Sequence, residues 1–194
     1  MNKQLTIRNH FHGNIKKIGG ALMETKAIIY YQLLIHNHWK VYIAATENGL
    51  CYLGTEHSSV EELAHTCKKQ FPNCQLVEAT EELSLYKQQL IEYFDGSRTQ
   101  FTFEVDVRGT NFQMNVWNAL SQIPYGDSFC YLDIANQIGN PKAVRAVGTA
   151  IGSNPVAIAI PCHRVLGKNG SLTGFSGGLD VKEKLLTLEN IPYK

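Results

Sequence analysis

The residues best suited to chemistry lie in the tetrapeptide Pro161-Cys162-His163-Arg164, which follows an apolar run over residues 155–160. A cysteine reacts as its thiolate, and we expect the neighbouring imidazole of His163 and guanidinium of Arg164 both to favour that anionic form. We therefore predict Cys162 as a nucleophile and His163 as its base. Adjacent side chains of an extended chain point to opposite faces. We expect either a backbone turn at Cys162 or a water molecule that carries the proton between sulfur and imidazole.

A histidine that acts as a base needs an acceptor that orients its ring. Few acids follow Gly109, and Glu189 lies near the end of an amphipathic stretch that includes Val181 and Leu185. We therefore predict that Glu189 accepts a hydrogen bond from His163.

The composition indicates an ordinary globular protein, since 44% of the 194 residues are hydrophobic and 18% are charged. No apolar run approaches the roughly 18 to 20 residues that span a bilayer, and residues 1–20 lack a signal-peptide core. The five cysteines are irregularly spaced, which argues against a disulfide framework and against a zinc site. We expect a cytoplasmic protein without membrane association or bound metal.

The first half of the chain has the pattern of a small α+β domain. Its candidate strands are rich in aromatic and β-branched residues, and Asn48-Gly49 is a turn signal between two of them. Ser59 is the predicted N-cap of the first helix, which Pro72 follows. The predicted strands are residues 28–34, 39–44, 50–53 and 101–107, and the predicted helices are residues 59–71 and 81–94.

The second half is predicted to be mostly helical, with helices at residues 112–123, 131–138 and 141–151. Gly139 provides a break, Asn140 the N-cap and Pro141 the first helical position of the last of these helices. A short helix, a tight turn and a second helix form the outline of a helix-turn-helix. The predicted fold is thus α+β with two domains, residues 25–108 and 109–194, after an N-terminal extension at residues 1–24.

The last predicted helix has two different faces. Val144, Val147 and Ile151 share the face expected to pack inward. Lys142, Arg145 and Thr149 share another, with small residues nearby, which suits close approach to a DNA groove. The alternative is an αα-hairpin whose small residues face protein. Charge favours DNA, because residues 134–179 contain four Lys or Arg and no Asp or Glu, whereas residues 24–107 are acidic.

The second half also resembles the O6-alkylguanine-DNA alkyltransferase family, whose signature is Pro-Cys-His-Arg-Val. The resemblance covers residues 109–189 almost continuously. It rests on several short motifs in the family's order: Val116-Trp117, Ile123-Pro124-Tyr125-Gly126, Arg145-Ala146-Val147-Gly148, Asn154-Pro155, residues 160–165, Ser176-Gly177-Gly178, Lys182 and Glu189. The first half resembles the family's variable N-terminal domain in size and pattern.

The resemblance implies a role for each matching position. Cys162 would take the alkyl group irreversibly and only once, His163 would be a water-mediated base, Glu189 would orient and charge the histidine, and Asn154 would hold the preceding turn. Arg145 would replace the extruded base in the duplex. Tyr131 would press on the adjacent phosphate and, with Ser176 and the backbone of Val165, would bind the flipped guanine. Asn140, Lys142 and Lys168 are the further residues expected to contact DNA.

The expected partner is therefore double-stranded DNA that contains O6-alkylguanine, bound by a monomer without an organic cofactor and with weak sequence preference. Activity on O4-alkylthymine stays open. Two other functions also stay open at this point, namely a cysteine hydrolase and a helix-turn-helix regulator with an inert cysteine. A hydrolase would turn over repeatedly, and a regulator would tolerate the loss of Cys162.

Overall fold

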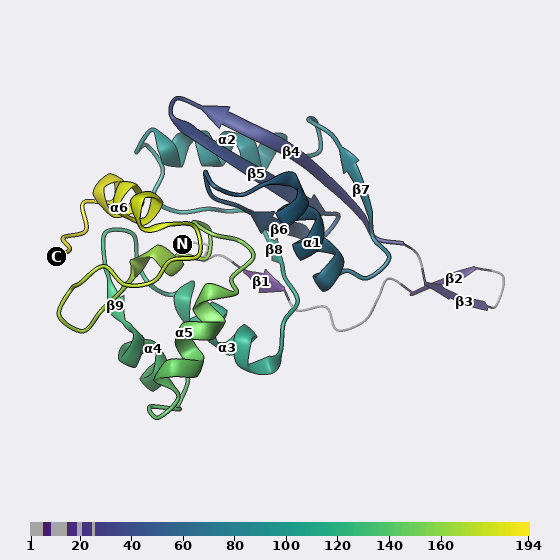
Figure 1. Cartoon of the computed structure of the whole chain (residues 1–194). Coiled ribbons are helices and arrows are strands. Elements are labelled where there is room, and N and C mark those ends of the chain that lie inside the picture. Colours follow the sequence, from purple (N-terminus) through teal and green to yellow (C-terminus); the bar gives the residue numbers. More distant parts are fainter. Residues whose placement is uncertain (1–5, 9–14, 19–20, 25) are drawn as a thin grey trace.

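The computed structural model describes residues 6–8, 15–18, 21–24 and 26–194. Two domains are present, a sheet-rich N-terminal domain and a mostly helical C-terminal domain (Figure 1). Of the expected N-terminal extension, residues 1–5, 9–14 and 19–20 lie outside the described residues. Its described parts form β1 (Ile7–Arg8) and a hairpin of β2 (Ile15–Ile18) and β3 (Ala21–Glu24). β1 joins the main sheet, so the extension contributes to the fold.

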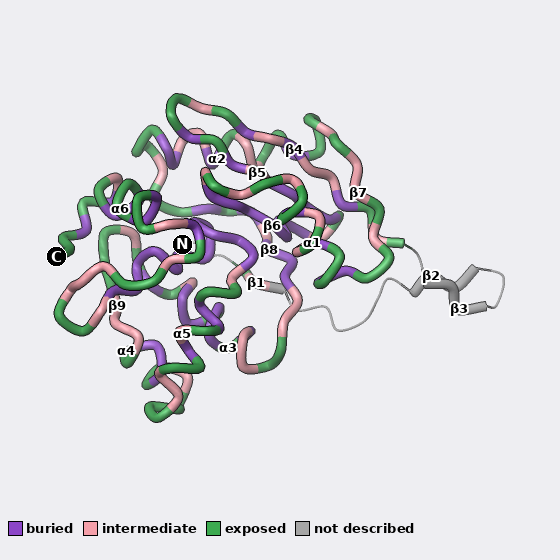
Figure 2. The backbone as a smooth tube through the Cα atoms, in the orientation of Figure 1, coloured by how far each residue is buried: buried purple, intermediate pink, exposed green. Residues whose placement is uncertain are grey.

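The N-terminal domain is built on a six-stranded sheet in the order β1-β8-β6-β5-β4-β7. Its antiparallel centre consists of β4 (Ile28–His36), β5 (Trp39–Thr46) and β6 (Gly49–Leu53), which confirms three predicted strands. On either side of this centre, β7 (Gln75–Glu78) and β8 (Val105–Asp106) pair in parallel with β4 and β6. The middle strands are buried along much of their length (Figure 2).

The predicted strand at residues 101–107 is wrong in extent, because only Val105 and Asp106 are paired. Phe101 and Phe103 are buried as the alternation requires. Their rings stack on each other with centroids 5.0 Å apart. Alternating burial therefore does not need a ladder of hydrogen bonds, and the segment packs as an extended chain.

Two helices cover opposite faces of the sheet (Figure 1). α1 (Val60–Gln70) buries Leu63 and Cys67 in a cluster with Ile29 and Cys51. It begins at Ser59, whose side chain accepts from the Glu62 amide, and Phe71 caps its end, as predicted. α2 (Ser84–Phe94) packs on the other face. It starts three residues later than predicted, because a turn from Glu81 to Ser84 precedes it.

The C-terminal domain contains four α-helices among the described residues, together with a one-turn 3₁₀ helix and two short strands. They are α3 (Asn111–Leu120), α4 (Tyr131–Gln137), α5 (Val144–Gly152), α6 (Leu179–Leu188), η1 (Cys162–Arg164), β9 (Phe129–Cys130) and β10 (Val165–Leu166). The Trp117 indole donates to the Ala150 carbonyl at 2.9 Å and ties α3 to α5. Within the described residues, every helix is too short or too polar to cross a bilayer.

The helix-turn-helix consists of α4, a turn and α5. The predicted start of its second helix is wrong. The Ala143 amide donates to the Asn140 carbonyl at 3.0 Å, which closes a turn, and α5 begins only at Val144. Pro141 and Lys142 therefore lie in this turn and not on the helix. Val147 and Ile151 point into the core, as predicted.

The two domains share a hydrophobic core, since one cluster contains Leu34 and Leu90 of the first domain with Trp117 and Leu185 of the second. Backbone bonds also cross between the domains. The Leu53 amide donates to the Pro155 carbonyl at 3.0 Å, and the Ala157 amide donates to the Leu53 carbonyl at 2.9 Å. The end of β6 therefore positions the segment that leads to Cys162.

Candidate active site

Cys162 begins η1, so the backbone turns at this residue, which was the first of the two arrangements expected. Its side chain is only 3% exposed. The approach to this turn is unusual, because Ile158 has a φ of +69°. A β-branched residue adopts this conformation only under constraint, at a cost of about 1–3 kcal/mol. The backbone bonds to β6 and the burial of Ile158 provide that constraint.

Asn154 holds the turn and the sulfur together. Its Nδ2 donates to the Ile160 carbonyl at 2.8 Å and lies 3.2 Å from Sγ of Cys162. Its Oδ1 accepts from the Val156 amide at 3.0 Å, which fixes the orientation of the amide group. One side chain thus spans the turn and presents a donor to the nucleophile, which stabilises a thiolate more than a thiol.

His163 directs Nε2 of its ring towards Glu189. Its Nε2 lies 2.9 Å from Oε1 of Glu189, and both side chains are fully buried. Arg164 binds the same carboxylate, with Nε 2.7 Å from Oε2 and Nη2 2.9 Å from Oε1. The expectation that the Arg164 guanidinium favours the Cys162 thiolate is therefore wrong, because its remaining donor, Nη1, is bound to the Ile123 carbonyl.

Glu189 is ionised in this setting. Burial alone would raise its pKa, but the hydrogen bonds of His163 and Arg164 and the charge of Arg164, joined in acid by the charge of the protonated His163 ring, outweigh burial and lower the pKa to about 2. For His163 the balance is reversed. Burial lowers its pKa below the usual value, and the opposing effect of Glu189 is smaller. The imidazole is thus neutral in the resting protein.

A neutral imidazole has one donor and one acceptor nitrogen. Because Nε2 faces an ionised carboxylate, the hydrogen-bond network assigns the proton to Nε2 and leaves a lone pair on Nδ1. Nδ1 of His163 is buried and has no hydrogen-bond partner among the described residues. A base in the correct tautomer, without a competing donor, is thus present next to Cys162 in the chain.

Lys182 supplies the cation that acts on the sulfur, and the sequence reasoning missed this role. Burial raises the pKa of Cys162 above its usual value, and the Asn154 hydrogen bond and the charge of Lys182 offset only part of that rise. The lysine is fully buried, and its Nζ donates to the carbonyls of Val165 and Thr173 at 2.6 and 2.8 Å. Burial brings its own pKa to about 8. The sequence did contain a signal for this role, because Lys182 precedes Glu189 at a spacing that places both on one side of a helix.

The residues expected to bind the flipped base lie on separate segments. Tyr131 starts α4, and its hydroxyl donates to the Thr173 carbonyl at 3.3 Å. Ser176 is exposed on the loop before α6. The Val165 carbonyl, expected to read the guanine amine, already accepts from Lys182.

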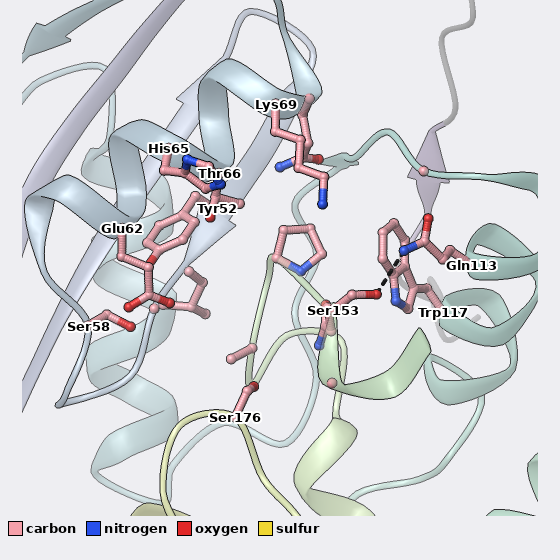
Figure 3. Close-up of a pocket in the computed structure, with 18 of the residues that line it drawn as sticks. Tyr52, Ser58, Glu62, His65, Thr66, Lys69, Gln113, Trp117, Ser153 and Ser176 are labelled. Carbon is pink, nitrogen blue, oxygen red and sulfur yellow. Dashed lines mark hydrogen bonds between the residues drawn. The ribbon is translucent and has the colours of Figure 1, made fainter. Parts of the chain in front are cut away.

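A cleft of about 650 Å³ lies between the domains beside Ser176 and Asn154 (Figure 3). α1 contributes His65 and Lys69 to its walls, and α3 contributes Gln113, which bonds to Ser153 at 2.9 Å. Cys162 is buried and does not line the cleft, but Asn154, which contacts its sulfur, does.

The residues expected to contact DNA are all exposed. Arg145 stands on α5, Asn140 and Lys142 lie in the turn before it, and Lys168 lies in a turn after β10. Among the described residues, no group of three His, Cys, Asp or Glu side chains is placed to hold a metal ion.

Comparison with known proteins places this site in a family. Residues 29–107 match "6-O-methylguanine DNA methyltransferase, ribonuclease-like domain", and residues 111–191 match "6-O-methylguanine DNA methyltransferase, DNA binding domain". The inducible methylated-DNA–protein-cysteine methyltransferase of Bacillus subtilis is 51% identical over 168 residues, which cover 86% of this chain and 94% of that protein. The chain belongs to the 6-O-methylguanine DNA methyltransferase family.

Solved structures of the same family agree in fold. The O6-methylguanine methyltransferase of Mycobacterium tuberculosis superposes with a TM-score of 0.71 at 40% identity, covering 83% of this chain and 92% of that one. A structure of the Mycobacterium tuberculosis protein in complex with DNA also has a TM-score of 0.71, at 39% identity over 82% and 92% of the two chains. The resemblance inferred from the second half thus extends to the N-terminal domain.

The two domains of this member of the 6-O-methylguanine DNA methyltransferase family meet at the carboxylate of Glu189. The hydroxyl of Tyr93, in the first matched range, donates to Oε1 of Glu189, in the second, at 2.5 Å. The sequence reasoning missed Tyr93 altogether. No local signal could have revealed it, because 96 positions separate the two residues.

Proposed function

We propose that this protein repairs DNA by moving the alkyl group of O6-alkylguanine onto Sγ of its own Cys162. The observation that carries the proposal is the placement of that sulfur 3.2 Å from the Asn154 amide, in a turn that also presents a neutral histidine bound to a buried carboxylate. The names of the relatives, which are methylated-DNA–protein-cysteine methyltransferases, support the same reaction.

The proposed reaction is a single displacement. The Cys162 thiol loses its proton to Nδ1 of His163 through a water molecule, and Glu189 stabilises the imidazolium that forms. The thiolate attacks the alkyl carbon, a C–S bond forms, and the bond from that carbon to O6 breaks. The electron pair passes to the guanine, which takes up a proton and is restored. Because a thioether is not hydrolysed, each molecule reacts once.

Base extrusion must precede this displacement, because O6 of a stacked guanine is out of reach of an in-line attack. We propose that Arg145 fills the vacated position and that Tyr131 presses on the neighbouring phosphate, while Ser176 and the Val165 backbone hold the flipped base. Asn140, Lys142 and Lys168 would contact the DNA backbone, which gives salt-dependent and weakly sequence-specific binding. All these side chains except Val165 are at least partly exposed.

We further propose that residues 109–194 carry the helix-turn-helix and the reactive site, and that residues 25–108 form the supporting domain. A reducing compartment such as the cytoplasm suits the protein, because all five cysteines are free thiols.

Intact-mass analysis tests the proposal. The protein is mixed with a twofold excess of duplex DNA that carries one O6-methylguanine, and peptide mapping then locates the added mass. We expect one methyl group per molecule, on the peptide that contains Cys162. Cys162→Ser should bind the duplex and gain no methyl group, whereas Cys130→Ser should react like the wild type.

Two outcomes would contradict the proposal. Repaired guanine in excess of protein would indicate a turning-over enzyme such as a hydrolase. Tight binding of one defined operator sequence, with Cys162 unmodified by the lesion, would indicate a regulator.

A further inference from the structure

Tyr93 lies on α2, in the domain that carries none of the residues assigned to alkyl transfer so far. Its side chain is 1% exposed and its ring packs against Phe94, Phe101 and Tyr125. A phenylalanine would make the same ring contacts. The hydroxyl is therefore the part of this residue that packing does not explain, and it is directed at Glu189.

Three donors converge on one oxygen of the site carboxylate. Oε1 of Glu189 accepts from the Tyr93 hydroxyl at 2.5 Å, from Nε2 of His163 at 2.9 Å and from Nη2 of Arg164 at 2.9 Å. The Tyr93 contact is the shortest of the three. Hydrogen bonds from a hydroxyl to a carboxylate are short and strong when the anion is buried, as Glu189 is.

The phenol also stays protonated, so it always donates. Burial raises the pKa of Tyr93 well above its usual value, and the negative charge of Glu189 raises it further. A carboxylate oxygen that is held by a rigid aromatic side chain cannot rotate freely, and the imidazole bound to that oxygen shares this restriction.

We propose that Tyr93 is a positioning residue for alkyl transfer. Its hydroxyl holds Oε1 of Glu189 in place and thereby sets the orientation of the His163 ring. It also determines how strongly the negative charge of the carboxylate acts on that ring. This inference rests on the proposed function and adds to it a residue from the other domain. It also gives the N-terminal domain a defined part in the chemistry, by one hydrogen bond across the domain boundary.

Several other groups face the pair of His163 and Glu189 and must be considered in any pH experiment. Arg164 of η1 lies against both, and the ammonium group of Lys182 on α6 lowers the pKa of His163. Tyr125 donates to the Leu188 carbonyl at 3.0 Å and stands near the carboxylate. Cys162 adjoins the histidine in the chain. None of these groups is altered by a change of Tyr93 to phenylalanine.

Tyr93→Phe removes one donor from Oε1. The freed charge then acts more strongly on His163, so the pKa of the imidazole should rise. Because the base must be neutral, the acid limb of the pH–rate profile should move to higher pH. Looser positioning should also lower the transfer rate constant on the high-pH plateau by roughly tenfold, as expected for loss of a hydrogen bond to a charged group. The dissociation constant for lesion DNA should not change.

The experiment measures single-turnover methyl transfer from saturating O6-methylguanine duplex as a function of pH, for the full-length wild type and Tyr93→Phe. Tyr86→Phe is the matched control, because Tyr86 lies two turns earlier on α2, packs against Phe103 and makes no contact with Glu189. It should keep the wild-type profile. ¹⁵N NMR titration of the His163 ring, without DNA, gives a readout independent of activity.

A double variant separates positioning from packing. If Tyr93 acts through Glu189, adding Tyr93→Phe to Glu189→Gln should slow transfer no further, whereas independent packing effects would multiply. If Tyr93→Phe does not fold, the wild type still provides a test. A hydroxyl proton in so short a hydrogen bond should resonate far downfield and should vanish in Glu189→Gln.

The possible failures are distinguishable. Absence of methyl transfer in the wild type would overturn the proposed function, while the NMR titration would still test the contact. Normal transfer in the wild type, with an unmoved acid limb and an unchanged His163 titration in Tyr93→Phe, would overturn the role of Tyr93. The role of Tyr93 would also be overturned if Tyr93→Phe lowered the rate of methyl transfer by the same factor in the wild type and in Glu189→Gln.

Discussion

Arg164 and Glu189 form a two-pronged ion pair inside the protein, with 2.7 Å between Nε and Oε2 and 2.9 Å between Nη2 and Oε1. The Glu189 side chain is fully buried and that of Arg164 is 8% exposed. Since Nη1 of Arg164 also holds the Ile123 carbonyl, this pair ties η1 to the end of α6 and to the loop after α3.

Removal of Arg164 should destabilise the fold strongly. Arg164→Ala leaves Glu189 with a buried charge that has lost its best partner, which typically costs about 3–5 kcal/mol. The free energy of unfolding in urea measures the effect. Arg98→Ala is the matched control, because it breaks a partly exposed ion pair with Glu92, and a solvated pair of this kind contributes little to stability. Similar losses in the two variants would show that the buried pair is not important for stability.

Acid should weaken the fold in two steps. The pKa of His163 lies below its value in the unfolded chain, so the unfolded state binds more protons as the pH falls below about 6.5, and the free energy of unfolding declines. The pKa of Glu189 is about 2 instead of 4.5. Its stabilisation is complete above about pH 4.5 and is lost as the pH falls towards 2.

Urea unfolding between pH 8 and pH 4 checks the first of these steps. His163→Gln, which cannot titrate, should flatten the curve between about pH 7 and pH 5. An increase in the wild type's stability on acidification over that range would contradict the neutral, buried histidine.

Lys182 should control the reactivity of Cys162. Its charge lowers the pKa of the thiol, so Lys182→Met should raise that pKa and reduce alkylation of Cys162 by iodoacetamide at neutral pH by roughly tenfold for each pKa unit. Peptide mass spectrometry separates Cys162 from the other cysteines. Lys184→Met is the control, because Lys184 lies on the same helix but binds Glu56 at the surface. Unchanged reactivity in Lys182→Met would exclude this electrostatic role.

Gly177 should tolerate no side chain, because the loop that carries Ser176 packs tightly on the N-terminal domain. A Cβ at Gly177 would overlap Cγ2 of Thr55 and would lie 2.7 Å from its Oγ1. Gly177→Ala should lower the free energy of unfolding by about 1–3 kcal/mol, as overpacking does, and should slow methyl transfer by displacing Ser176.

Gly152→Ala provides the contrast, because a Cβ there meets open space at the end of α5. It should be neutral or should stabilise the helix by up to about 1 kcal/mol. Equal thermal stability of the two variants would mean that the contact between Thr55 and the loop that carries Ser176 is loose.

Much of the local structure could be predicted because its causes are adjacent in the chain. The Ser59 cap of α1 and the strands around Asn48-Gly49 follow from short patterns and are present as predicted. Predictions failed where a short sequence pattern is compatible with two local structures. Asn140-Pro141 can start a helix or close a turn, and here the bond from the Ala143 amide to the Asn140 carbonyl closes a turn.

By itself, the sequence determined which residues are available for chemistry, namely the Pro-Cys-His-Arg motif and a later glutamate, and the alternation of strand and helix patterns that builds the two domains. Only the tertiary structure decided how the charges are paired. It directs Arg164 to Glu189 and not to the sulfur, makes Lys182 the cation that lowers the pKa of Cys162, and brings Tyr93 to Glu189 across 96 positions. Such contacts depend on how whole elements pack, and no short stretch of sequence contains that information.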